Sequence, residues 1–174
     1  MWISTNDGTV YQVDPGNDTP ARKVKVSEPD SEQDLAYADR SLWHGASQGQ
    51  LVRIDPRTME IVATVRGVSG SKLFTDGHDL WAADEVEGTI SKIGTESNAV
   101  VATVGVRPVT HAIVADGMVW ARPEADRLLL VDGRTNHVEA FGLPSGEYDA
   151  DVVVGFGSLW VAHFLLNEVW RVEL

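Results

Sequence analysis

The sequence contains no cysteine, which excludes disulfide bonds and thiolate chemistry and leaves the redox compartment undetermined. Long hydrophobic runs are also missing, since no stretch approaches the roughly 18 apolar residues that a membrane-spanning helix needs. Basic residues are scarce: 14 Lys and Arg stand against 26 Asp and Glu, and the formal net charge is −12. This charge argues against nucleic acid and anionic membrane surfaces as partners, because both need a basic face.

Motifs of common enzyme chemistry are absent as well. The chain has no Gly-x-Ser-x-Gly elbow, no phosphate loop and no Gly-x-Gly-x-x-Gly turn. A signal peptide is not recognisable, because Trp2 already belongs to a repeat. We therefore expect a cytoplasmic protein if Met1 is the native start, and an extracytoplasmic one if the chain is a fragment of a longer protein.

What the sequence has instead is an internal repeat. Five of its tryptophans, at positions 2, 43, 81, 120 and 160, are separated by 41, 38, 39 and 40 residues. A near-constant period of about 40 residues is the mark of a repeat architecture. Such regular recurrence also predicts that these tryptophans form core between repeats, in preference to a platform for sugars or bases.

Each period contains the same series of short strands. The Trp strand is followed by a turn and by a run with period-2 alternation, which is typical of a half-buried strand. These alternating runs are Thr9–Asp14, Gln50–Asp55, Thr89–Ile93, Arg127–Asp132 and Glu168–Val172. A third strand is predicted at Arg22–Val26, Ile61–Val65, Val100–Val104 and His137–Phe141. A fourth, small and apolar, is predicted at Leu35–Ala38, Leu73–Thr75, Ala112–Ala115 and Val152–Gly155.

Four short antiparallel strands per period predict an all-β fold, a β-propeller of four-stranded blades. The small fourth strand suits the innermost position around a central channel. We predict a single propeller domain or propeller fragment over residues 1–174, with repeats near 1–40, 41–78, 79–117, 118–157 and 158–174. The chain thus holds about 4.5 blades, a count that is consistent with an incomplete ring.

The strand count leaves three alternatives for the assembled ring. The last small strand closes a four-bladed ring and leaves residues 159–174 over, or the chain forms five blades that lack two strands, or it belongs to a longer propeller of six to eight blades. We favour the third, because the last repeat is well formed and stops within a blade. Open blade edges favour association, so we expect a homodimer or a domain swap.

The repeat resembles bacterial propellers of the YVTN and streptogramin-lyase-like superfamily, which includes virginiamycin B lyase. The resemblance rests on Val101–Gly105, Pro108, Ala115-Asp116-Gly117 and Val119-Trp120-Ala121, and it covers essentially the whole chain. It implies a seven-bladed, Mg²⁺-dependent C–O lyase with a catalytic histidine, or one of the many non-catalytic sensor and binding modules with this fold. Fold alone does not choose between these functions.

One column of ionisable residues stands nine positions before the later tryptophans. Its members, Asp34, Lys72, His111 and Asp151, each lie just before the small innermost strand. The propeller fold places this column at the rim of the central channel, where it would bind a polar ligand. His111 is the candidate catalytic base, because an unperturbed histidine titrates near neutrality. The alternative is that these loop residues are polar only because they are solvated.

Other candidates carry less chemistry. His44, His78, His137 and His163 show no metal-ligand spacing and are interpreted as surface or partly packed histidines. Asp84, Glu85 and Glu87 form an acidic cluster that is either a Ca²⁺ site or a solvated loop. Trp170 breaks its column and is predicted to pack against a blade absent from the chain or swapped from another copy.

The function expected from the sequence is a non-catalytic propeller scaffold that binds a small polar ligand or a protein, at the channel rim or across an exposed edge. The alternative is a metal-assisted lyase or hydrolase with His111 as base, so whether the chain is an enzyme is left open. No cofactor is predicted, although Mg²⁺ or Ca²⁺ is compatible with the alternative.

Overall fold

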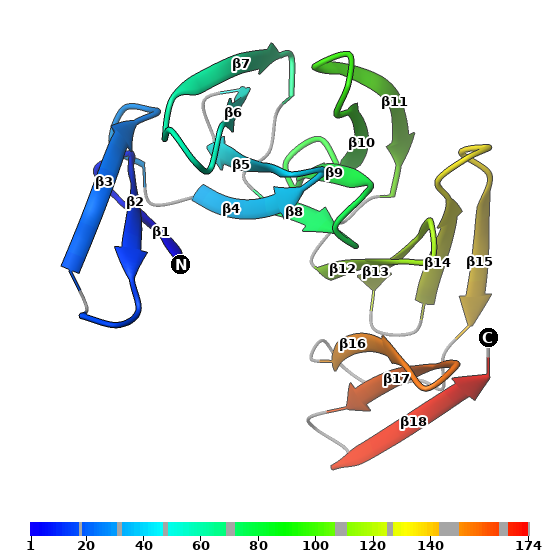
Figure 1. The fold of residues 1–174 in the computed structure, drawn as a ribbon. Coiled ribbons are helices and arrows are strands. Elements are labelled where there is room, and N and C mark those ends of the chain that lie inside the picture. Colours follow the sequence, from blue (N-terminus) through cyan, green and yellow to red (C-terminus); the bar gives the residue numbers. More distant parts are fainter. Residues whose placement is uncertain are drawn as a thin grey trace. The chain divides into compact units, whose positions relative to one another are not determined.

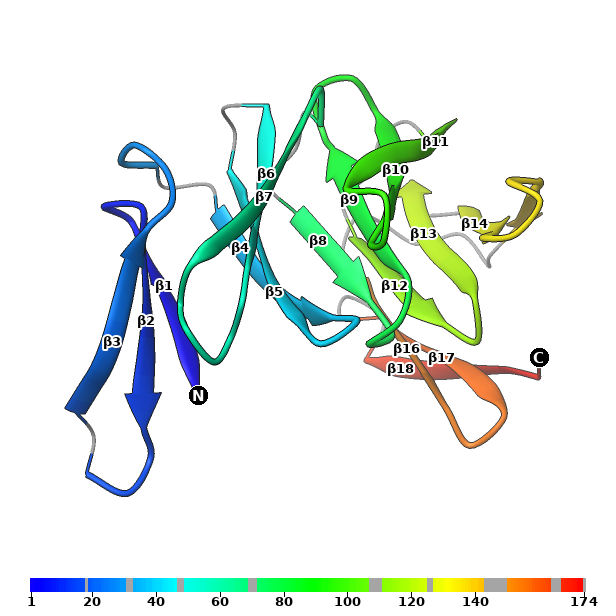
Figure 2. The ribbon, with the colours of Figure 1, turned by 45° about the horizontal axis from the view of Figure 1, so that its top comes forward.

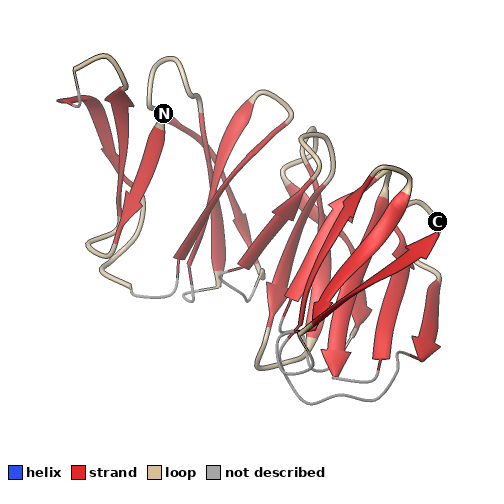
Figure 3. Ribbon diagram, turned by 90° about the horizontal axis from the view of Figure 1, so that it is seen from below, coloured by secondary structure: helices blue, strands red, loops and turns tan. Residues whose placement is uncertain are grey.

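The structure is a computed structural model that describes residues 1–17, 19–30, 33–46, 49–68, 72–106, 111–124, 127–142, 150–163 and 167–173, without the side chains of 111, 122–124, 150, 151 and 163. These residues form strands and turns only (Figure 3). No helix with the length and apolar character of a membrane span occurs in this part of the chain.

The strands form five antiparallel sheets, each a contiguous stretch of sequence (Figure 1), which we call blades 1 to 5. Blade 1 contains β1 (Trp2–Thr5), β2 (Thr9–Asp14) and β3 (Thr19–Lys25). Blade 2 contains β4 (Gln33–Ala38), β5 (Ser41–Ala46), β6 (Gln50–Ile54) and β7 (Ile61–Arg66). Blade 3 contains β8 (Lys72–Thr75), β9 (Leu80–Asp84), β10 (Thr89–Gly94) and β11 (Ala99–Gly105).

The last two blades repeat this order. Blade 4 contains β12 (His111–Ala115), β13 (Met118–Glu124), β14 (Arg127–Asp132) and β15 (Val138–Gly142). Blade 5 contains β16 (Ala150–Gly155), β17 (Ser158–His163) and β18 (Glu168–Glu173). Blades 1 and 5 have three strands and the others four, so the strands predicted from the repeat are confirmed in number and order within the described residues.

The chain divides into two compact units. Blades 1 to 3 belong to the first unit, residues 1–84 and 91–103, apart from the turn between β9 and β10, the first two residues of β10 and the end of β11. Blades 4 and 5 belong to the second unit, residues 85–90 and 104–174. Within each unit the first strands of successive blades are in contact, β4 with β8 and β12 with β16, as Figures 1 and 2 show.

In blades 2, 4 and 5 the turn between the first two strands contains two consecutive residues with positive φ. Asp116–Gly117 and Phe156–Gly157 connect their strands in this way, with φ between 52° and 74°, as expected for a tight type I′ hairpin turn. Blade 2 has Asp39–Arg40 at the same place, with φ of 45° and 59°. The left-handed conformation disfavours a long side chain by about 1 kcal/mol, and Arg40 adopts it at the position where blades 4 and 5 have Gly117 and Gly157.

In blades 2 and 4 the turn between the third and the fourth strand is built around an aspartate. The Asp55 carboxylate accepts hydrogen bonds from the amides of Arg57 at 2.7 Å and Thr58 at 3.4 Å. Asp132 does the same in blade 4 with the amides of Arg134 and Thr135. These backbone amide donors hold the pKa of both carboxyl groups below the usual value.

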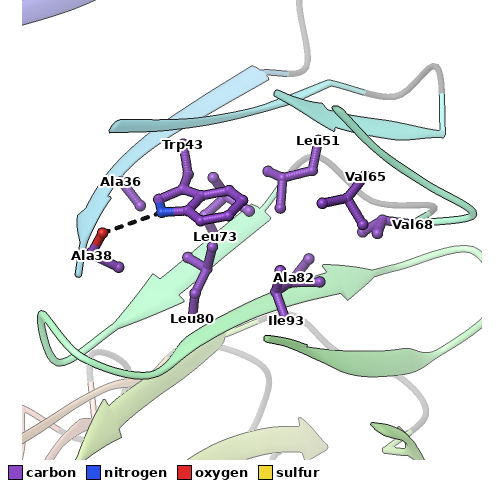
Figure 4. Close-up of a cluster of buried hydrophobic side chains, with 10 residues drawn as sticks. All are labelled: Ala36, Ala38, Trp43, Leu51, Val65, Val68, Leu73, Leu80, Ala82 and Ile93. Carbon is purple, nitrogen blue, oxygen red and sulfur yellow. Dashed lines mark hydrogen bonds between the residues drawn. The ribbon is translucent and has the colours of Figure 1, made fainter. Parts of the chain in front are cut away.

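The repeated tryptophans lie in the core between blades. Trp43 and Trp81 have no exposed surface, and Trp120 retains 8 %. Figure 4 shows Trp43 among apolar side chains of blades 2 and 3, with its indole nitrogen donating to the Ala38 carbonyl at 3.2 Å. The prediction that the repeat tryptophans are core is therefore confirmed for these three.

A cation lies over the tryptophan ring in three of the five blades. Arg53 stands 5.2 Å from the centre of the Trp43 ring, Lys92 stands 5.7 Å from Trp81, and Arg171 stands 5.7 Å from Trp160. Each cation also contacts the residue two positions before its tryptophan, which is Ser41, Asp79 and Ser158 respectively. Blade 4 replaces this pair with Met118 and Leu130, two apolar residues. The cation over the tryptophan ring is thus a structural feature of the repeat.

Trp170 differs from its prediction. Its side chain is partly buried against a cluster of the second unit that contains Trp120, Leu128 and Leu159. The indole nitrogen donates to Glu168 at 2.9 Å. The register pairs Trp170 with Val161, whose side chain faces the same cluster. Trp170 therefore packs on a cluster formed by blades 4 and 5 of its own chain, and no absent or swapped blade is needed to explain it.

Candidate functional site

The ionisable column predicted from the sequence lies at the start of the first strand of each blade. Asp34 is the second residue of β4 and Lys72 the first of β8. His111 and Asp151 hold the corresponding places in β12 and β16, where their backbones pair with Arg122 and Ala162. The expected placement at one end of the small strands is seen in the backbone of all four blades.

Asp34 uses its carboxylate within the fold. One oxygen accepts the amide hydrogen of Leu35 at 2.8 Å, and the other accepts that of Leu73 at 3.0 Å. Leu73 belongs to β8, so this side chain ties the first strand of blade 2 to that of blade 3. Lys72, the residue before it, is exposed. The acidic residue at position 34 is thus explained by the Leu73 amide of the next blade, which donates a hydrogen bond to its carboxylate.

His111 and Asp151 stay predictions as ligand-binding residues, because their side chains lie outside the described part of the structure. The same holds for the assignment of His111 as a catalytic base. Asp34 and Lys72 are in the first unit and the other two are in the second. We therefore describe Asp34 and Lys72 apart from His111 and Asp151 and do not combine the four residues into one site.

A buried polar cluster lies beside Asp34, at the interface of blades 1 and 2. Nε2 of His44 is 2.8 Å from Oε1 of Gln33, and the same oxygen accepts a hydrogen bond from the Ser4 hydroxyl at 2.8 Å. The Gln33 amide nitrogen donates to the carbonyls of Thr5 at 2.8 Å and Asp30 at 2.6 Å. The amide nitrogen is thus used for two carbonyls, so Oε1 is the acceptor and His44 donates from Nε2.

His44 is therefore a neutral imidazole whose second nitrogen has no partner. Its side chain has no exposed surface, and Nδ1 forms no hydrogen bond within the described structure. Burial lowers the pKa of His44, and the nearby carboxylates of Asp30 and Asp34 oppose the shift only in part. Because solvent does not reach the ring, a dissolved substrate does not reach it in this conformation.

The sequence interpretation of His44 as a surface or partly packed residue is wrong, since it is fully buried. The signal that would have found it is its column in the repeat. The residue after each tryptophan is Ile3, His44, Ala82, Ala121 and Val161. A histidine among four apolar residues at a core position indicates a local polar cluster, and Gln33 and Ser4 supply it.

Metal sites find no support among the described side chains, where no group of three or more His, Cys, Asp or Glu is arranged to hold an ion. The acidic residues considered for Ca²⁺ differ from one another: Asp84 is buried, whereas Glu85 and Glu87 are exposed.

Comparison with solved structures identifies the fold. BamB from Moraxella catarrhalis superposes with a TM-score of 0.76 and 12 % identity over 99 % of this chain. The dihydro-heme d1 dehydrogenase NirN, in complex with DHE, gives 0.74 and 12 %, and the computationally designed Ika8 protein gives 0.81 and 13 %, each over 99 % of this chain. The chain is a β-propeller protein.

These similarities extend to the fold alone, since every identity is below 25 %. The chain spans 55 % of BamB and of Ika8 and 43 % of NirN, about half the length of the solved structures that it matches. No family model and no curated protein sequence matches it. The resemblance of this propeller to streptogramin lyases therefore stays a prediction.

Proposed function

We propose that this propeller is a non-catalytic scaffold that binds a protein partner through the exposed face of its last blade, and that the partner is the first blade of a second copy. One observation carries the proposal. Val169 of blade 5 is 66 % exposed, whereas Leu51, at the same repeat position in blade 2, is 1 % exposed.

The rest of the same face supports this contrast. Val153 is 58 % exposed, and its blade 2 counterpart, Ala36, is 8 % exposed. Trp160 is partly exposed, whereas Trp43 is fully buried. Blade 2 buries these positions against blade 3. A sheet face with the composition of an inter-blade core, left in contact with water, is a typical protein-binding surface.

The first blade offers the complementary face. Met1 and Ile3 are 57 % and 43 % exposed, whereas Leu42 and His44 occupy the same positions in blade 2 and are buried. Charge is complementary as well. The outer strand of blade 1 carries Arg22, Lys23 and Lys25, while β18 carries Glu168 and Glu173 around one arginine. We infer a head-to-tail contact between unlike faces of two chains.

The proposed contact repeats a packing that the chain already uses between blades 2 and 3. Blade-on-blade packing, which buries Leu51 and Trp43 within this chain, would be the same between copies. The lyase alternative has no observation in its favour among the described residues.

The test is the oligomeric state of the 174-residue chain by sedimentation velocity, over about 1–100 µM. We expect self-association that Val169→Glu weakens about tenfold or more, because a charge would be buried in the contact. Val101→Glu is the matched control, since Val101 is 56 % exposed on an outer strand. A chain that stays monomeric throughout, or that responds equally to both substitutions, contradicts the proposal.

A mixing experiment tests the direction of the contact. Val169→Glu leaves the first-blade face intact, and Ile3→Glu leaves the last-blade face intact. If unlike faces meet, each variant alone associates about tenfold or more weakly than the parent chain, and an equimolar mixture forms a heterodimer. A symmetric contact between two copies of blade 5 predicts instead that Ile3→Glu associates as the parent chain does.

A further inference from the structure

A basic groove lies in the first unit, on blade 2 and at the nearest turn of blade 3. It has a volume of about 610 Å³, within the range of small-molecule sites. Three arginines line it, Arg40, Arg53 and Arg57, and Asp55 is the one acidic residue among the described residues that do so. Such a concentration of positive charge is unexpected in a chain with a net charge of −12.

The single carboxylate of the groove is occupied. Asp55 accepts the backbone amides of Arg57 and Thr58, and its other oxygen is 3.5 Å from the Arg57 guanidinium. Arg57 is itself mostly exposed. Asp55 is therefore engaged by the turn and by Arg57, and it leaves the charges of Arg40 and Arg53 without compensation.

Arg53 differs from its two counterparts in the repeat. Lys92 has Asp79 at 3.0 Å and Arg171 has Glu173 at 3.8 Å, so both of those cations are paired with a carboxylate. Among the described residues, the contacts of Arg53 are with neutral groups: the Ser41 hydroxyl at 2.9 Å, the Thr95 carbonyl at 2.6 Å, the Asn98 side-chain oxygen at 3.1 Å and the Trp43 ring. These contacts hold the guanidinium in place without neutralising it.

Arg40 gives independent support from the backbone. It occupies the left-handed turn position where the equivalent residues of blades 4 and 5 are Gly117 and Gly157. It makes no hydrogen bond or ion pair within the described part of the chain. A long charged side chain kept at a conformationally unfavourable place, with no structural partner, indicates a functional role for its charge.

We propose that this groove binds a ligand that carries an oxyanion, either a phosphate or a carboxylate group. Arg40 and Arg53 supply the guanidinium donors that suit planar or tetrahedral oxygens. Tyr37, which is 46 % exposed and stacks on Trp2 with ring centres 5.9 Å apart, provides an aromatic wall for the rest of the ligand. The site is independent of the inter-copy contact proposed above, because none of its described lining residues belongs to blade 1 or blade 5.

The repeat itself supplies clean test variants. Arg40→Gly removes the charge and places glycine where the fold prefers it, so its melting temperature without ligand should equal or exceed that of the parent chain. Arg53→Leu reproduces the apolar residue that blade 4 places over its tryptophan. Arg134→Gln is the charge-matched control, since Arg134 holds the position of Arg57 in the turn of blade 4.

The experiment is a titration of the 174-residue chain with inorganic phosphate and, separately, with citrate, at constant ionic strength. The melting temperature and the amide NMR shifts of Ser41 and Asn98 are followed. We expect a saturable response to at least one probe, weakened about tenfold in Arg40→Gly and in Arg53→Leu and unchanged in Arg134→Gln. Saturation by phosphate alone or by citrate alone identifies which oxyanion the natural ligand carries.

Two results would overturn the proposal. One is the lack of a saturable response to either probe. The other is a response of the same strength in folded Arg40→Gly as in the parent chain. Because Arg40→Gly is expected to fold at least as well as the parent, an unfolded Arg53→Leu variant does not prevent the decision.

Discussion

Blades 2 and 5 are copies of one repeat, yet they use it differently. Both place an arginine over the repeat tryptophan and bind that arginine through a serine hydroxyl, Ser41 or Ser158. In blade 2 the tryptophan is fully buried against the next blade, whereas in blade 5 it is partly exposed. The internal geometry of the sheet is therefore set by the repeat, while burial is set by the neighbouring blade.

This difference indicates how stability is distributed along the chain. In repeat proteins the free energy of unfolding is approximately the sum of contributions within each repeat and contributions from each interface with a neighbour. The same residue type then contributes more where both faces of its sheet are covered. Two side chains with equal contacts within their own blades are therefore expected to contribute differently to the free energy of unfolding when only one of them is covered by a neighbouring blade.

The largest expected effect tests that difference directly. Trp43→Ala removes a fully buried ring and its hydrogen bond to the Ala38 carbonyl, and we expect a loss of about 3–5 kcal/mol in the free energy of unfolding. Trp160→Ala removes a partly exposed ring that makes the equivalent bond to Gly155, so a loss of about half that size is expected. Urea unfolding followed by circular dichroism measures both, and equal losses would show that the interface does not set the difference.

Much of the fold could be predicted from the sequence, because the same pattern of strands recurs in each of the five repeats. The spacing of tryptophans and the alternating runs located the strands of the described residues. The error on Trp170 has a physical cause. Its residue type departs from its column, but the register places it opposite Val161, on the face that contributes to the cluster of blades 4 and 5.

The site was less predictable, since it depends on single residues that differ from the repeat. The role of Asp34 requires knowing that the Leu73 amide of the next blade lies 3.0 Å away, and spacing along the chain does not give this distance. Arg40 and His44 were accessible in principle, because each breaks a column of glycine or of apolar residues. To recognise them, one compares the residues at each repeat position and looks for the one that differs from the others.

A second, smaller effect on the free energy of unfolding distinguishes Asp34 from Lys72, the two members of the ionisable column in the first unit. Asp34→Ala leaves the amides of Leu35 and Leu73 without their acceptor, and we expect a loss of about 1–3 kcal/mol. Lys72→Ala, at the exposed neighbour in the same column, should change stability by less than about 0.5 kcal/mol. Chemical denaturation of the two variants compares them, and a larger effect at Lys72 would reverse the assignment.

The smallest effect concerns His44, where blade 2 departs from the apolar column of the other blades. His44→Val introduces the residue that blade 5 has at this position, and Gln33 keeps Ser4 as a donor to its oxygen. The lost hydrogen bond and the removal of the unpartnered Nδ1 oppose each other, so at pH 7.5 we expect a change within about 1 kcal/mol. Thermal unfolding at this pH provides the reference for the pH dependence.

The pH dependence follows from the direction of the shift. Burial lowers the pKa of His44 below the value of 6.5 expected in the unfolded chain. Between these two values the unfolded state binds a proton that the folded state does not, so stability falls as the pH is lowered through this range and is fully present above pH 6.5. The parent chain should therefore lose more stability between pH 7.5 and pH 5 than His44→Val does. His137→Val, at an exposed histidine, controls for the loss of a histidine as such. Equal pH dependence in the parent chain and His44→Val would mean that the buried imidazole does not destabilise the folded chain on protonation, and that the polar cluster of blade 2 tolerates the charge.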